Sequence, residues 1–205
     1  GGNIVVTFTP KGVAGATITK FEIGYIEGIK SVYPNAEIVD FYCNSWGDPA
    51  AAKTAAKSMY DSGCYCIFAA AGGSGLGLMA QAKEERLAGK NVWAIGVDSD
   101  QYEDGVYAEG KSAVLTSMLK MVENSTLDAL NKVADGSWKG GVVTQNLKNS
   151  GVGFSKANSE LKASAVAAAE KAAEGILNGT IKVNKTYKAS LAAGLAPAGL
   201  SAIDD

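Results

Sequence analysis

Short apolar runs alternate with segments of helical pattern through the first half of the chain. The apolar runs are rich in β-branched and aromatic residues, and the apolar residues between them recur at helical spacing. This alternation is typical of parallel strands that are buried on both faces and covered by helices. It predicts an α/β fold, a Rossmann-like parallel sheet with helices on both faces. The expected strands are 4–8, 37–42, 64–70 and 92–97, and the expected helices are 17–32, 49–62 and 75–87.

The pattern becomes less regular beyond residue 101. A polar, glycine-containing stretch follows and is expected to be a connector. The tail from residue 190 onward is small and apolar without a clear period. The expected elements in this half are a strand at 113–118, a helix at 119–134, a strand at 142–147 and an alanine-rich helix at 159–177 that Asn178-Gly179 ends.

Composition narrows the class of function. The 205-residue chain has a net charge of −2 and a single arginine, Arg86. Nucleic-acid binding is therefore not expected, because it requires a basic stripe. The chain contains no histidine, which excludes histidine general bases, Ser–His and Cys–His nucleophile pairs and histidine metal sites. No metal or other cofactor is expected.

The cysteines and the chain start are the next constraint. The chain has three cysteines, an odd number and too few for a disulfide framework. They are Cys43, Cys64 and Cys66. We interpret them as small buried hydrophobes, the alternative being a redox or metal role. No run reaches the ~18 apolar residues of a membrane helix. The first residues lack the pattern of a signal peptide, as in the mature form of an exported protein.

Acidic residues end the expected strand at 92–97. In an open parallel sheet, ligands bind in the crevice outside the carboxyl ends of the strands. Of Asp98 and Asp100, Asp98 lies nearer the end of the strand and is the better candidate to face this crevice. A carboxylate there suits vicinal hydroxyls such as those of a sugar. An Asx turn or a helix cap is the alternative role for either residue.

A glycine run, Gly72–Gly77, lies between an expected strand and an expected helix. Leu78 stands where a dinucleotide-binding loop needs its third glycine, and the Lys-Ser/Thr of a phosphate-binding P-loop is absent. Three interpretations stay open. The run forms a tightly packed turn, lets the backbone approach a neutral ligand, or binds phosphate at the helix N-terminus.

Trp46 and Lys120 are the remaining candidates. Trp46 lies in a loop after the expected strand 37–42, where it either stacks on a flat ligand or packs within its own lobe. Lys120 falls at the start of an expected helix, where the helix dipole disfavours a cation. That placement suggests a binding role, with a solvated surface lysine as the alternative. Trp93 and Trp138 are assigned to core and surface packing.

The order of these motifs resembles the basic membrane protein family of substrate-binding lipoproteins, whose best-understood members bind purine nucleosides for ABC importers. The glycine run followed by VDSDQ is the specific part of the resemblance. The matching runs are ITKFEIGYIEGIKSVYP at 18–34, AAKSMYDSGCYCIFAAAGGSGLG at 55–77, IGVDSDQ at 95–101, VLTSMLKMVE at 114–123, KGGVV at 139–143 and NGTIKV at 178–183.

The resemblance implies a type I periplasmic-binding-protein fold, in which two Rossmann-like lobes close over a ligand. It implies that Trp46 stacks on a nucleobase, that Asp98 holds ribose hydroxyls, and that Lys120 reaches the same sugar or the base. The backbone contacts to the edge of the base are expected from Gly72, Gly73, Ser74 and Gly75.

The resemblance does not include the half of the first lobe with which family members begin, and which carries a lipidated cysteine. Residues 1–111 are therefore expected to form the second lobe. Residues 112–150 are expected to cross the hinge toward the first lobe, with 151–205 as the return segment and C-terminal helix. The expected helix 119–134 then needs a partner for its apolar face, either a first-lobe fragment or a second copy.

The sequence thus predicts an extracytoplasmic solute-binding protein, not an enzyme. It would capture a purine nucleoside or a similar small polar ligand for an ABC permease, with a lipid anchor in the full-length precursor. A chain without one lobe is expected to bind weakly or not at all. One alternative is a ligand-sensing or surface-antigen domain without a transport role. Another is a Rossmann-like enzyme acting on a nucleotide or sugar, with Asp98, Asp100 and Lys120 as the acid–base candidates.

Overall fold

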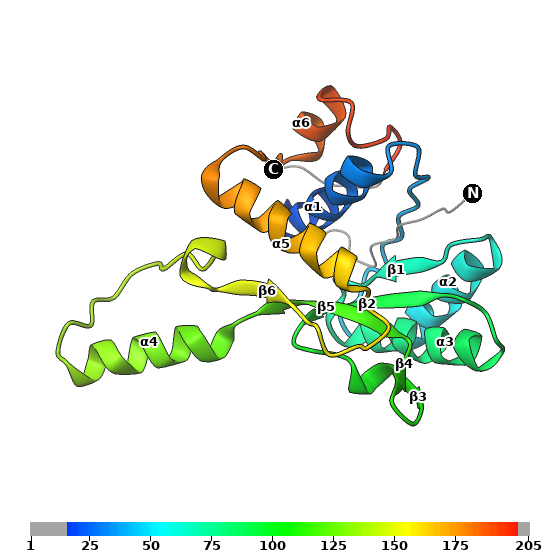
Figure 1. Ribbon diagram of the computed structural model, residues 1–205, viewed down its shortest axis with the longest axis horizontal. Coiled ribbons are helices and arrows are strands. Elements are labelled where there is room, and N and C mark those ends of the chain that lie inside the picture. Colours follow the sequence, from blue (N-terminus) through cyan, green and yellow to red (C-terminus); the bar gives the residue numbers. More distant parts are fainter. Residues whose placement is uncertain (1–15, 201–205) are drawn as a thin grey trace.

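The computed structural model describes residues 16–200 and contains a four-stranded sheet with helices on both sides (Figure 1). The expected strand at 4–8 lies outside the described residues. The strands follow the order β1-β2-β5-β6, in which β1, β2 and β5 are parallel and β6 runs antiparallel to β5. This confirms the α/β class. The four strands are β1 (Cys66–Phe68), β2 (Trp93–Asp98), β5 (Val114–Lys120) and β6 (Val152–Phe154).

The helices of the first half lie close to their predicted positions. A short hairpin, β3 (Val106–Ala108) with β4 (Lys111–Ser112), occupies part of the expected connector. Short 3₁₀ turns occur at η1 (Gly72–Ser74), η2 (Glu103–Gly105) and η3 (Leu147–Asn149). The helices are α1 (Ala16–Val32), α2 (Pro49–Asp61), α3 (Gly75–Leu87), α4 (Val122–Ala134), α5 (Ala163–Asn178) and α6 (Tyr187–Ala192).

Helix ends follow local chemistry. Asp48 caps α2, its Oδ1 accepting the N–H of Ala51 at 2.9 Å, and Pro49 occupies the first turn. Gly179 ends α5 in the left-handed conformation, with a φ of 81°. Such a residue satisfies the last carbonyls of a helix at little steric cost when it is glycine.

Two predicted strands are corrected by the structure. The segment 37–42 contains only one bridge residue, Phe41. The segment 142–147 is irregular up to the start of η3, and Val142 and Val143 are 98% and 61% exposed. β-Branched residues favour a strand only where a neighbouring strand and a packed face support it, and these two valines contact little.

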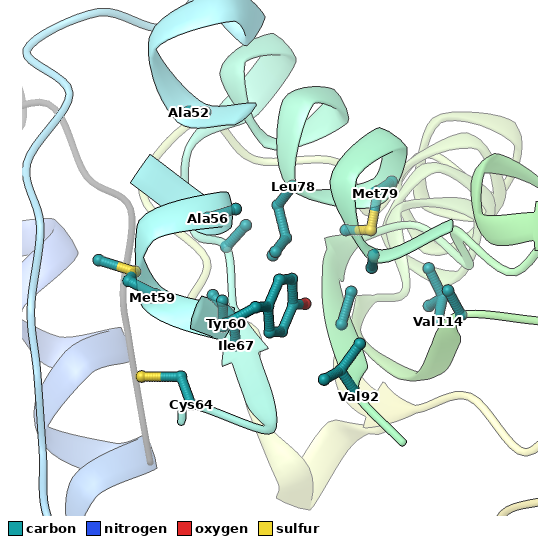
Figure 2. Close-up of a cluster of buried hydrophobic side chains, with 14 of the residues drawn as sticks. Ala52, Ala56, Met59, Tyr60, Cys64, Ile67, Leu78, Met79, Val92 and Val114 are labelled. Carbon is teal, nitrogen blue, oxygen red and sulfur yellow. The ribbon is translucent and has the colours of Figure 1, made fainter. Parts of the chain in front are cut away.

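The main core lies between the sheet and the pair α2 and α3 (Figure 2). Ile67 from β1, Leu78 from α3 and Ala94 from β2 are fully buried there. The hydroxyl of Tyr60 donates to the backbone oxygen of Trp93 at 3.0 Å, so the polar end of this aromatic ring is satisfied inside the core.

The cysteine thiols serve packing where they are buried. Cys64 belongs to the main core, and the Cys66 sulfur lies 3.7 Å from the Tyr25 hydroxyl. Burial raises the pKa of Cys64, and it raises the pKa of Cys66 to about 11. Cys43 is half-buried and donates to the backbone oxygen of Ser45. Cys64 and Cys66 are therefore poor nucleophiles.

Arg86 links its own helix, α3, to three other parts of the chain. Its guanidinium carbon lies 4.1 Å from the centre of the Trp93 ring, and Nε donates to the Tyr107 hydroxyl at 3.1 Å. Nη2 contacts both carboxylate oxygens of Glu160, at 2.9 and 3.0 Å. The side chain thus links α3, β2, the β3–β4 hairpin and the segment before α5, which also gives Trp93 its packing role.

Helix α4 projects from the rest of the molecule (Figure 1). None of its residues is buried, and Val122, Leu127, Leu130 and Val133 are each about 60% exposed. Trp138, in the following turn, is 52% exposed. No helix within residues 16–200 has the length and apolarity needed to cross a bilayer.

The contact between α2 and α3 generates a stability prediction. A Cβ on Gly77 would lie 1.9 Å from the backbone oxygen of Pro49 and 2.8 Å from the nitrogen of Lys53. We expect Gly77→Ala to lower the free energy of unfolding by about 1–3 kcal/mol or more, because the helices must separate. Gly28→Ala is the matched control, since Gly28 is an exposed helical glycine with nothing within 4 Å. It should stabilise by about 0.5–1 kcal/mol. Equal effects in urea titrations of both variants would contradict this packing.

Candidate functional site

The candidate residues meet at one edge of the sheet because β1, β2 and β5 are parallel. Asp98 ends β2, Lys120 ends β5, and the glycine turn η1 begins four residues after β1. The prediction that Lys120 starts a helix is wrong. Leu119 pairs with both β2 and β6, and Lys120 pairs with β6. The strand therefore continues to Lys120, and α4 begins only at Val122.

Asp98 and Lys120 form an ion pair at this edge. Lys120 Nζ lies 2.7 Å from Asp98 Oδ1. The Asp98 side chain is 54% exposed and the Lys120 side chain is 45% exposed. Lys120 Nζ also lies 5.1 Å from the centre of the Phe21 ring, which belongs to α1. The ammonium group therefore has a carboxylate and an aromatic face as neighbours and still reaches solvent.

The backbone of Asp98 is in the left-handed region, with a φ of 71°. Such a conformation is uncommon for a residue with a side chain, although aspartate tolerates it. It is supported by the chain that follows, since the N–H of Val97 donates to Gln101 Oε1 at 2.9 Å and the N–H of Gln101 donates to Ser117 Oγ at 3.0 Å. Strained backbone of this kind concentrates at functional sites.

A cavity of about 410 Å³ lies beside the ion pair. Its lining includes both charged side chains together with the start of α4. Trp46 and the glycine turn are not among its lining residues. The lining residues are Asp98, Ser99, Asp100, Leu119, Lys120, Met121, Val122 and Glu123.

Asp100 is engaged within the protein. Its Oδ1 accepts the N–H of Tyr102 at 3.1 Å, and its Oδ2 accepts the hydroxyl of Ser155 at 2.8 Å. The first bond is the Asx turn that the sequence left open for this residue. Both aspartates line the cavity, but both oxygens of Asp100 are held within the protein, so Asp98 remains the better candidate for a ligand contact.

Trp46 lies against the glycine turn. A Cβ on Gly72 would be 3.2 Å from Cε3 of the Trp46 ring, and Gly72 has a φ of 53°. Glycine is favoured there by its backbone conformation and by the close approach of the ring. The indole is 39% exposed, so it is neither fully packed in its lobe nor free in solvent.

The four residues expected to contact the base through their backbone differ in exposure. Gly72 and Gly73 are exposed, whereas Ser74 and Gly75 are buried. The structure thus brings Trp46 together with Gly72 and Gly73, and Asp98 together with Lys120. Both groups stand at the carboxyl edge of the same sheet.

Sequence reasoning missed the residues that hold these groups. Phe21, Gln101 and Ser117 lie beside or beneath the ion pair. Gln101 could have been suspected from its place directly after the acidic strand end, but Phe21 and Ser117 come close only through packing of distant segments. Within the part of the chain described, no three cysteine, aspartate or glutamate side chains gather as a metal site.

Comparison with solved structures identifies the fold. The structure matches an ABC transporter solute-binding protein from Aeropyrum pernix with a TM-score of 0.73, at 20% identity over 94% of this chain and 62% of that one. At this identity the likeness shows the fold alone, which is that of ABC solute-binding proteins of the type I periplasmic class.

The family is shown by sequence. A family model described as ABC transporter substrate-binding protein PnrA-like matches residues 2–187. The chain belongs to this family, Bmp, as the motifs predicted. It is 41% identical over 182 residues to the ABC transporter nucleoside-binding protein BmpA of Lactococcus lactis, covering 84% of this chain and 51% of that protein. It is 36% identical over 179 residues to the CD4+ T-cell-stimulating antigen of Listeria innocua, covering 84% and 50%. The chain thus spans about half the length of these relatives.

The exposure of the ion pair predicts a small role in stability. We expect Asp98→Asn and Lys120→Met each to change the free energy of unfolding by less than ~1 kcal/mol, because half-exposed pairs contribute little. Asparagine also tolerates the left-handed backbone of residue 98. Lys132→Met, which removes the exposed Lys132–Asp128 pair of α4, is the control. A loss of several kcal/mol for Asp98→Asn alone in urea titrations would instead assign the pair to folding.

Proposed function

We propose that this chain provides one face of a purine-nucleoside site in an extracytoplasmic solute-binding protein that serves an ABC permease. The observation that carries the proposal is that the partly exposed Trp46 and the half-exposed Asp98–Lys120 pair both lie at the carboxyl edge of the same sheet. The family and the name of the Lactococcus lactis relative support the ligand class. The lipid anchor of a full-length precursor rests on the family resemblance.

The two groups of residues match the two parts of a nucleoside. The Trp46 indole offers a flat face for a base, an interaction worth ~1–3 kcal/mol in nucleic-acid sites. The exposed backbone at Gly72 and Gly73 can hydrogen bond to the edge of that base. The Asp98 carboxylate accepts from sugar hydroxyls, and the Lys120 ammonium donates to ligand oxygens.

The charge of the site favours a neutral ligand over a phosphate. Lys120 is paired with Asp98 at 2.7 Å, so the two charges cancel locally. A phosphate would meet the Asp98 carboxylate as well as the ammonium, and like charges at this distance are unfavourable. We therefore favour a nucleoside over a nucleotide, and close backbone approach over phosphate binding at the glycine turn.

Binding without turnover is the favoured activity. General acid–base chemistry requires a free group within reach of the substrate. Both carboxylate oxygens of Asp100 are held by Tyr102 and Ser155. That leaves Asp98, already paired with Lys120, as the remaining carboxylate of the three acid–base candidates.

We propose that residues 1–111 form most of one lobe and that residues 112–150 cross toward the other, although β5 within this range still pairs with β2 in the sheet of the first-named lobe. β5 leads out to α4, and β6 returns beside β5 (Figure 1). The exposed apolar face of α4 then meets a first lobe, supplied by a separate fragment or a second copy. Residues 151–205 form the return segment and C-terminal helices.

The nucleoside proposal predicts a selective change at Trp46. In the amide and indole NMR spectrum of the ¹⁵N-labelled chain, titration with inosine should shift the Trp46 indole signal, with weak affinity because one face of the site acts alone. The exposed Trp138 indole should not move. Asp98→Asn should weaken binding at least tenfold, since charge-assisted hydrogen bonds are each worth ~1.5–3 kcal/mol.

Free ribose and inosine monophosphate are the comparison ligands. Ribose should bind more weakly than inosine because it lacks the stacking face, and the monophosphate should bind more weakly because of Asp98. Equal shifts at Trp46 and Trp138, or an unchanged spectrum at millimolar inosine, would contradict the proposal.

The exposed face of α4 predicts a partner. We expect light scattering to show that the chain self-associates, and that Leu130→Glu lowers the association because a charge now lies on the apolar face. Leu87→Glu is the control, because Leu87 is similarly exposed at 66% but ends α3. A monomeric chain that binds a hydrophobic dye at α4 would instead favour a first-lobe fragment. A monomer whose dye binding is unaffected by Leu130→Glu would contradict both partners.

A further inference from the structure

Ser74 is the residue that connects the two loops of the proposed base-binding face. Its side chain is fully buried, at 0% exposure. Its hydroxyl donates to the backbone oxygen of Ser45 at 2.7 Å and accepts the N–H of Asp48 at 2.8 Å. Its own N–H donates to the backbone oxygen of Trp46 at 3.0 Å. A single residue thus bonds to the backbone before, at and after Trp46.

These bonds join parts of the chain that are distant in sequence. Ser45 and Asp48 lie 29 and 26 residues from Ser74. Asp48 caps α2, and α3 begins at Gly75, directly after Ser74. These Ser74 hydrogen bonds, called the clamp below, therefore lie where the N-termini of two packed helices approach each other. The main core between the two helices fixes their separation.

The neighbouring glycines allow the loops to touch. A Cβ on Gly73 would be 3.2 Å from the Trp46 backbone oxygen, and one on Gly72 would be 3.2 Å from the ring. The Trp46 loop and the glycine turn are thus in direct contact at Gly72 and Gly73 as well as through the Ser74 hydrogen bonds. Movement of one loop without the other would break at least three hydrogen bonds.

We propose that Ser74 is a positioning residue that locks the Trp46 loop to the glycine turn, so that the indole and the exposed backbone of Gly72 and Gly73 form one rigid surface. This replaces the backbone contact with the edge of the base that the family resemblance implied for Ser74. The ligand part of the inference rests on the proposed function. Rigidity before binding raises affinity because less ordering remains to be done when the ligand arrives.

Ser74→Ala tests this role in two independent measurements. Without ligand, the heteronuclear NOE of the Trp46 indole N–H should fall, because the loop gains motion on the picosecond to nanosecond scale. With inosine, the affinity should fall about three- to tenfold, the cost of ordering one released side chain and its loop.

Ser112→Ala is the matched control. Ser112 is also fully buried, donates to the backbone oxygen of Tyr102 at 2.7 Å and accepts the N–H of Val114 at 3.1 Å. Its loss should destabilise the fold in the same way as the loss of Ser74. It should leave the Trp46 NOE and the inosine affinity unchanged, which separates positioning from general stability.

The outcomes are distinct. An unchanged Trp46 NOE in Ser74→Ala overturns the clamp, whatever the ligand does. A lowered NOE with unchanged inosine affinity overturns the role in binding. If the unaltered chain binds no inosine, the proposed function fails, and the NOE still decides whether the clamp exists. If Ser74→Ala does not fold, Ser74→Cys keeps a weak donor and acceptor and should give an intermediate NOE; a value equal to that of the unaltered chain overturns the clamp.

Discussion

The parallel pairing of β1, β2 and β5 is the constraint on which the candidate site depends. Parallel strands end at a common edge, so residues that are separated by many positions along the chain arrive together without any contact having to bring them there. Asp98 faces Leu119 in the register of β2 and β5, which places the next residue, Lys120, within 2.7 Å of the carboxylate. The packing of α2 and α3 beneath the sheet then holds the glycine turn and the Trp46 loop at the same edge.

The site and the fold use similar groups for different purposes. Elsewhere, charged side chains are engaged in several bonds, as where Lys90 contacts both the exposed Asp61 and the buried Glu85. Hydrogen bonds from Lys57 and then Lys90 lower the pKa of Asp61, and the hydrogen bond from Lys90 lowers the pKa of Glu85. Arg86 is held by two aromatic rings and a carboxylate. The Asp98–Lys120 pair is half exposed and borders a cavity. Asp98 has a strained, left-handed backbone, whereas Arg86 and the residues that contact it have no positive φ.

The sequence allowed most of the regular structure to be predicted, because helix caps and periodicity are local. The predicted start of α2 at Pro49 and both ends of α3 agree with the structure. Prediction failed where an outcome depends on distant neighbours. Val142 and Val143 resemble a strand but have no strand beside them, and Lys120 was assigned to a helix because its pairing with β6 is invisible in the sequence. The strand-end rule did find Asp98 and the glycine run. It could not separate the exposed Gly72 from the buried Ser74, since burial follows from packing.

The short antiparallel strand β6 has a mechanical consequence. Lys120, the last residue of the outgoing strand β5, pairs with Val152, the first residue of the returning strand β6. The segment between them, including α4, leaves the sheet and rejoins it at these two neighbouring strand ends, and η3 near the end of the segment also contacts α5. A force on α4 is transmitted first to that pair of residues, one of which carries the ammonium group beside Asp98. The segment that carries α4 and the charged contact with Asp98 thus share Lys120, so that a shift of α4 relative to the sheet would also move the ammonium group.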